Sequence, residues 1–179
     1  MSTHRPLVLS PAPSRCSLEM LTLHYGDVYE HSPWVAEAAW HHGLSEEHDA
    51  PSELAKLMGL MLQQASSEQQ INVIRAHPDL AGKAAMAGEL TQDSTSEQAG
   101  AGLNQCSAAE FAQFEFLNDA YKKKFGFPFV IAVKGLDRGA ILAAFAERLN
   151  NDAAAERQTA IEQIMRIACL RLIDLASKA

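Results

Sequence analysis

The sequence has few cysteines, and their spacing excludes two classes of protein. Cys16, Cys106 and Cys169 are the three cysteines in 179 residues, and no Cys-x-x-Cys pair occurs. An odd number of widely separated cysteines predicts neither a disulfide framework nor a thiolate metal site. We therefore expect a reducing compartment and a cytoplasmic protein.

Long apolar runs and clusters of basic residues are also missing. No apolar run approaches the roughly 20 residues that a helix needs to cross a bilayer. Residues 1–17 contain one short apolar patch broken by prolines, which makes a poor signal peptide and predicts a flexible N-terminal extension. Lys and Arg number 15 against 22 Asp and Glu, for a formal net charge of -7. We therefore predict neither a membrane nor a nucleic-acid partner.

Several catalytic motifs have no match in the chain. There is no Gly-x-Ser-x-Gly, no phosphate-binding loop and no dinucleotide fingerprint. The segment 41–48, HHGLSEEH, has residue types that bind metals, but not the spacings of zinc-protease or di-iron helices. We interpret it as a solvated loop between helices and predict no metal site, with a metal-dependent hydrolase as an alternative.

Helical patterns dominate the chain that remains. Its length and its 47% of hydrophobic residues predict one compact domain, and the helical patterns make it a multi-helix domain over residues 18–179. Two Ser-x-x-Glu sequences, at 94–97 and 107–110, match the capping box that opens a helix. We expect further helices to be opened by the following residues: Ser32, Pro51, Ser67, Asp79, Asp137 and Ala153.

Residues 127–134 depart from this helical pattern. The sequence FPFVIAV is β-branched and aromatic, yet no convincing partner strand exists elsewhere, and Pro128 weakens any ladder. We predict an extended, buried segment within an all-α protein. Its backbone N–H and C=O groups need partners, and a polar ligand is one of the few solutions.

His77 stands at the end of a predicted helix, in IRAHPDLAGK. The helix should end near Ala76, because a residue before proline is pushed out of the α region. A histidine at a helix C-terminus is stabilised when protonated, which alone would explain it. The alternative is an acid or base held in place by Pro78, and the pattern by itself leaves both open.

Five blocks together resemble the OHCU decarboxylase family, whose substrate is 2-oxo-4-hydroxy-4-carboxy-5-ureidoimidazoline. The resemblance runs from about Leu18 to the C-terminus. The blocks are YEHSPWVAEAA (29–39), IRAHPDLAGKA (74–84), Ser94-x-x-Glu97-Gln98 leading into AGL (101–103), LNDAYKKKFGFPFVIAVKG (117–135) and IACLRLIDL (167–175).

The resemblance implies an all-helical, cofactor-free homodimer that decarboxylates OHCU to (S)-allantoin in urate degradation. It implies that His77 is the catalytic acid or base, that Glu97 orients or charge-tunes it, and that Arg171 completes the catalytic set. Arg166, earlier in the same helix, competes with Arg171 for that role. The implied substrate-binding residues are Pro78, Ser94, Gln98, Phe129, Val130, Ile131, Ala132 and Val133.

The implied reaction explains the choice of residue types. The substrate carboxylate lies beside a carbinol carbon and a ring C=N, so the substrate itself accepts the electrons released with CO2 and needs no thiamine, pyridoxal or metal. A histidine suits proton transfer because its ordinary pKa, about 6.5, is close to neutral. A non-catalytic helical ligand-binding or interaction module on the same fold is the competing hypothesis.

Overall fold

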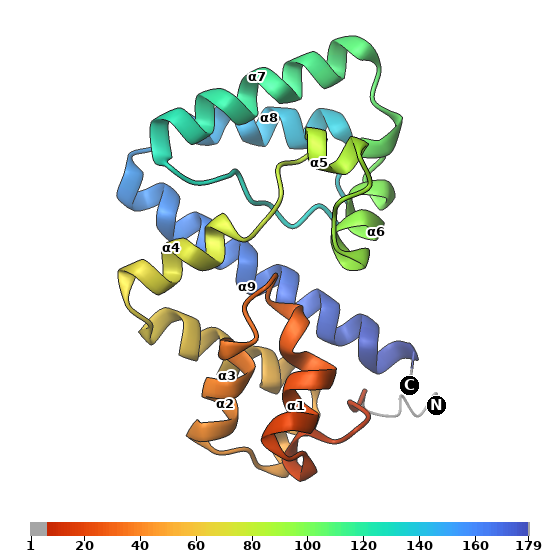
Figure 1. Ribbon diagram of the computed structural model, residues 1–179, viewed down its shortest axis with the longest axis vertical. Helices are drawn as coiled ribbons and strands as arrows, with labels where there is room; N and C mark the ends of the chain where they lie inside the picture. The colour runs from red at the N-terminus through yellow and green to blue at the C-terminus, as the bar shows by residue number, and fades with distance from the viewer. Residues whose placement is uncertain (1–6, 179) are drawn as a thin grey trace, which may run out of the picture. The chain divides into compact units, whose positions relative to one another are not determined.

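The computed structural model describes residues 7–178, apart from the side chain of Ala84, and within this range it contains helices and no β-strand (Figure 1). The all-α prediction is confirmed. The α-helices are α1 (Leu18–Tyr25), α2 (Trp34–His42), α3 (Pro51–Gln64), α4 (Ser67–Arg75), α5 (Lys83–Met86), α6 (Gln92–Gly100), α7 (Ala108–Phe125), α8 (Arg138–Arg148) and α9 (Ala153–Lys178). Short 3₁₀ turns are η1 (Pro13–Arg15), η2 (Gly26–Val28), η3 (Glu46–Asp49) and η4 (Leu103–Gln105).

The chain divides into two compact units. The first comprises residues 1–73 and 165–179, and the second comprises residues 74–164. The boundaries fall inside α4 and α9, so each of these helices contributes residues to both units. The sequence predicts one functional domain over residues 18–179. This division into two units does not test that prediction.

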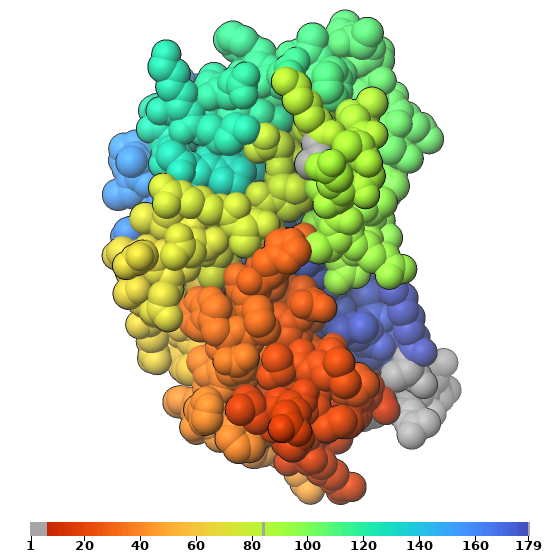
Figure 2. Space-filling view, viewed as in Figure 1, coloured from red at the N-terminus to blue at the C-terminus, as the bar shows by residue number. Residues whose placement is uncertain are grey.

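The first unit is built from α1, α2 and α3 together with the C-terminal part of α9. Helix α2 packs against both α1 and α3. A Cβ atom at Gly59 of α3 would lie 2.6 Å from Cε of Met165, so the glycine permits the close approach of α9. The side chains with no exposed surface include Leu21, Val35, Leu54, Met58 and Leu172. In the space-filling view the red and orange residues of this unit form a closely packed surface (Figure 2).

The N-terminal residues of the first unit are in contact with its helices. Leu9 is buried, and its N–H donates to the carbonyl of Asp49 at 2.8 Å. Ser14 Oγ donates to the Asp49 carboxylate at 2.9 Å, and Trp40 Nε1 donates to the carbonyl of Cys16 at 3.0 Å. Residues 1–6 of the predicted flexible extension lie outside the described residues, and flexibility of residues 1–17 stays a prediction.

The second unit has an aromatic core. Phe114 and Tyr121 of α7 are fully buried, as is Phe145 of α8. The Phe145 ring stacks on Phe129 of the extended segment, with centroids 3.8 Å apart and planes at 12°. Burying each such ring contributes on the order of 2–3 kcal/mol. The extended segment is therefore part of the hydrophobic core of this unit.

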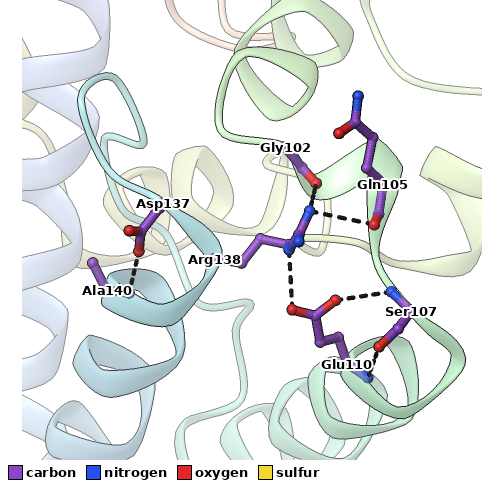
Figure 3. Close-up of polar contacts among 7 residues, drawn as sticks. All are labelled: Gly102, Gln105, Ser107, Glu110, Asp137, Arg138 and Ala140. Carbon is purple, nitrogen blue, oxygen red and sulfur yellow. Dashed lines mark hydrogen bonds and ion pairs between the residues drawn. The ribbon is translucent and has the colours of Figure 1, made fainter.

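Arg138 joins the connection after α6 to the starts of α7 and α8 (Figure 3). Its Nε donates to Glu110 Oε1 at 3.0 Å, and its Nη1 donates to the carbonyl of Gly102 at 2.9 Å. Glu110 also closes the predicted capping box, because its carboxylate accepts from the Ser107 N–H at 2.8 Å. Asp137 caps α8 as predicted, accepting from the Ala140 N–H at 2.8 Å. These contacts hold the connection after α6 against the starts of α7 and α8.

Other predicted helix starts are wrong by a few residues. Ser66, not Ser67, caps α4, through reciprocal bonds with Gln69. Ser32 donates its hydroxyl to the Glu30 carbonyl and makes no cap for α2. The short helix predicted from Leu80 instead begins at Lys83 behind Gly82, because Ala81 adopts φ +49°. Short polar side chains compete for nearby backbone groups, and the sequence alone does not decide between neighbouring candidates.

Within residues 7–178, we find no helix with the length and apolar character needed to cross a membrane.

Candidate active site

His77 lies in the turn that directly follows α4. Its N–H donates to the carbonyl of Ile74 at 3.1 Å, and only 8% of its surface is exposed. Helix α4 ends at Arg75, as Pro78 predicts. Pro78 itself is half-buried. The imidazole is therefore a largely buried group on a turn and not a surface cap of the helix.

Gln98 holds the turn that follows His77. Its Oε1 accepts from the Ala81 N–H at 3.0 Å, and its Nε2 donates to the carbonyl of Asp79 at 3.2 Å. The side chain is 6% exposed. Both ends of this amide thus bind the loop backbone. The family resemblance implies that Gln98 binds the substrate, and the structure shows that it binds the backbone of the loop.

The start of α6 differs from the prediction, and the difference bears on Glu97. The helix begins at Gln92, and Thr91 is its N-cap, with Oγ1 accepting from the Ser94 N–H at 3.3 Å. The predicted Ser94–Glu97 capping box is therefore wrong. Thr91 is a good cap because its side-chain oxygen reaches an otherwise unpaired N–H. Glu97 lies inside the helix, past the first turn that Thr91 caps.

Ser94, Glu97 and Gln98 share one face of α6. Their spacing of i, i+3 and i+4 places them one above another on a helix. Ser94 and Gln98 are buried, and Glu97 is half-buried. The structure thus brings the predicted residues of this motif onto one rigid element, and Gln98 links that element to the His77 turn.

The extended segment receives side-chain partners for its backbone. Arg148 Nη1 donates to the carbonyl of Val130 at 2.7 Å, and Gln163 Oε1 accepts from the Ala132 N–H at 3.0 Å. Phe129, Val130, Ala132 and Val133 are buried, whereas Ile131 is half-buried. The prediction of an extended, buried segment is confirmed. Its partners include α8 and α9 side chains, which the sequence had not identified.

A buried charge network supports the same segment. Glu156 has no exposed surface, and its carboxylate accepts from Arg148 Nε at 2.6 Å, from Asn151 Nδ2 at 2.9 Å and from the Tyr121 hydroxyl. The Arg148 guanidinium also lies 4.3 Å from the centroid of the Phe129 ring. Burial, and then the hydrogen bond to Glu156, raise the pKa of Tyr121, which keeps its hydroxyl a donor. Charged residues do not contribute to the apolar pattern that predicts burial, so the sequence does not indicate that Arg148 and Glu156 are buried.

Arg171 belongs to the first unit. Its Nη1 donates to Glu30 Oε2 at 2.9 Å, and the two residues are 5% and 2% exposed. Arg166, the competing arginine of α9, is exposed. A buried arginine on a buried carboxylate has a fixed orientation. Glu30, from the YEHSPW block, is a partner that the sequence reasoning had not singled out.

The histidines of segment 41–48 lie at the end of α2 and in the 3₁₀ turn η3. His41 and His42 are exposed at the end of α2, and His48 Nδ1 accepts from the Ser45 N–H at 3.0 Å. In the described part of the chain, no group of three or more His, Cys, Asp or Glu is arranged to hold a metal ion.

The sequence and the fold match known proteins. The family model described as OHCU decarboxylase matches residues 15–173. A 2-oxo-4-hydroxy-4-carboxy-5-ureidoimidazoline decarboxylase of Halalkalicoccus jeotgali is 41% identical over 150 residues, covering 84% of this chain and 81% of that protein. The protein of the same name from Amia calva is 40% identical, covering 84% and 85%.

Two solved structures resemble the fold. A structure of OHCU decarboxylase in the presence of (S)-allantoin has a TM-score of 0.67 and 26% identity, covering 84% of this chain and 95% of that chain. An (S)-allantoin synthase has a TM-score of 0.73 and 28% identity, covering 94% of this chain and 54% of that one. Residues 15–173, which the family model matches, include His77, the 94–98 motif, residues 129–133 and Arg171.

Proposed function

The chain belongs to the OHCU decarboxylase family, and from this we propose that it is a carboxy-lyase that converts OHCU to (S)-allantoin in urate degradation. The observation that carries the proposal is the arrangement of the motif residues in the second unit. His77 is buried on a turn, and that turn is bound by Gln98 from the helix that bears Ser94 and Glu97.

The proposed reaction places little demand on the protein beyond positioning and proton transfer. The bond between the carboxylate and the ring carbon breaks, CO2 leaves, and the electron pair moves toward the ring imine nitrogen. A proton must then reach one face of the ring system to give a single enantiomer. His77 is the proposed acid or base for this transfer. Because the substrate accepts the electrons, no cofactor is needed.

The remaining motif residues have proposed roles in binding. Glu97 orients the imidazole and favours its charged form, as a nearby carboxylate does. Arg171, held by Glu30, supplies a fixed positive charge for an anionic substrate. Ser94 and Gln98 are proposed to contact the substrate by hydrogen bonds, as are main-chain groups of residues 129–133, with Pro78 packing beside it. These directional groups suit the ureido and ring amides.

We propose in addition that the protein is a cytoplasmic homodimer. The family resemblance implies the dimer, and the cysteine content supports a reducing compartment. Sedimentation equilibrium at micromolar concentration should give twice the chain mass, and a monomer mass at every concentration would exclude the dimer.

The function is tested by the optical activity of the product. Freshly generated OHCU, incubated with the protein, should yield allantoin with an enantiomeric excess of the S form. Spontaneous decay gives racemic allantoin, so the excess is specific to a catalysed route. Racemic product formed at the rate of the protein-free control would refute the proposed function.

Replacing Glu97 with glutamine should lower kcat about 10–100-fold, because the imidazole loses a charged partner. The melting temperature should change little, since Thr91 and not Glu97 caps α6. Steady-state kinetics and thermal melts on the same preparation measure both effects.

The matched control is Thr91→Ala. Loss of this cap should cost about 1 kcal/mol of stability while kcat per folded molecule changes little. If Glu97→Gln instead lowers stability as Thr91→Ala does, and activity only in proportion, its role is structural.

A further inference from the structure

The turn after His77 has a backbone that needs external support. Ala81 has φ +49°, in the left-handed region that residues with a Cβ atom seldom adopt. This conformation costs about 1–2 kcal/mol and persists only where surrounding contacts hold it. A Cβ atom at Gly82 would lie 2.8 Å from Cβ of Asp79, so the turn also closes tightly on itself.

Part of the turn borders open space. Two cavities, of about 240 and 300 Å³, both include Ala81 in their lining. A backbone bordered by open space loses contacts that a close-packed interior would give it. Hydrogen bonds therefore add to the packing that buries Ala81, whose exposed fraction is 2%.

Two side-chain amides bind three consecutive residues of the turn. Gln98 of α6 binds the Asp79 carbonyl and the Ala81 N–H. Asn118 of α7 donates from Nδ2 to the intervening Leu80 carbonyl at 2.9 Å and is 3% exposed. One helical turn later, Lys122 Nζ pairs with Asp79 Oδ2 at 2.6 Å. Helix α7 thus binds the turn through two side chains, Asn118 and Lys122.

We infer that Asn118 is a positioning residue for His77, acting through the backbone of the turn. This inference rests on the proposed function of His77. Leu80 is three residues from His77, and Pro78, whose φ is fixed, lies between them, so a shift of the Leu80 carbonyl also moves the backbone that carries the imidazole. A displacement of about 1 Å at a catalytic group lowers rates by about 100-fold.

The inference is tested with Asn118→Leu, which keeps the branched shape and the number of side-chain heavy atoms and removes the donor. We expect kcat to fall about 10–100-fold and KM to change less than about 3-fold. The enantiomeric excess of the allantoin should also fall, because a misplaced imidazole protonates the two faces less selectively. Enzyme concentrations are adjusted to equal catalysed rates, so that spontaneous decay contributes equally in every sample.

Gln113→Leu is the matched control, since Gln113 is an exposed amide on the same helix. It should leave kcat and enantiomeric excess unchanged. If Asn118→Leu does not fold, Asn118→Ala decides the question by the same two measurements, because a methyl side chain cannot donate to Leu80. A merely structural role would lower the folded fraction but not the enantiomeric excess.

Wild-type enantiomeric excess and kcat in a folded Asn118 variant would overturn the inference. Failure of the proposed function would look different: the wild-type protein itself would give racemic product, or His77→Asn would retain full turnover. The two failures are therefore separable in one set of assays.

Discussion

Replacing His77 with asparagine should reduce OHCU turnover by about 1,000-fold while the protein stays folded. Proton transfer by a positioned side chain contributes about 10²–10⁴ to a rate, and asparagine cannot exchange a proton near neutral pH. The fold should tolerate the change because asparagine is polar and smaller, and because the bond from the residue 77 N–H to the Ile74 carbonyl uses the backbone. Initial rates of (S)-allantoin formation, with circular dichroism as a check on folding, measure the result.

His41→Asn is the matched control for this substitution. His41 is exposed at the end of α2 and belongs to the segment that the metal-dependent alternative would use. We expect it to retain wild-type turnover, with or without a chelator. Unchanged turnover in His77→Asn would refute the role of His77, and absence of turnover in every form, wild type included, would favour a non-catalytic module.

Replacing Glu156 with glutamine should produce the largest loss of stability, about 3–5 kcal/mol of unfolding free energy. The substitution leaves the Arg148 charge in a site that is 8% exposed, with no carboxylate opposite it. Removing one partner of a buried ion pair costs this much because the remaining charge is uncompensated. Glutamine can still accept one bond from Tyr121 or Arg148, but its amide N–H₂ faces donors. Urea denaturation followed by circular dichroism measures the change.

Glu162→Gln supplies the comparison on the same helix. Glu162 is exposed, and its contact with Gln158 is a surface hydrogen bond, so we expect a change of no more than about 0.5 kcal/mol. If Glu156→Gln is as stable as this control, the buried network does not hold the extended segment, and the role assigned to Arg148 is wrong.

The helical fold was predictable from local patterns, because most of its helices carry a start signal or an apolar stripe, although several starts were misplaced. The box at Ser107 and Glu110 and the cap at Asp137 formed as predicted, since no neighbouring residue competes with them. The start of α6 was predicted wrongly because Thr91 and Ser94 are both good caps three residues apart. The structure uses Thr91, and the sequence alone does not decide between the two candidates.

The candidate site was predictable only as far as its motifs extend along the chain. The residue types around His77 and Glu97 indicated chemistry, and the family resemblance gave them roles. Asn118, Arg148 and Gln163 were missed because each acts on backbone groups 18–38 residues away. A polar residue at a buried helix position was the one available signal, and in Asn118 it sits between the core residues Leu117 and Tyr121.

Thr91 as the N-cap also determines where α6 tolerates a change in chain length. The cap fixes the point from which successive residues rotate by about 100° around the helix axis. One residue inserted between Thr91 and Ser94 would turn Ser94, Glu97 and Gln98 together by that angle, and Gln98 would lose both of its backbone partners. An insertion before Thr91 leaves that angle unchanged, so loop grafting near this site belongs on the N-terminal side of the cap.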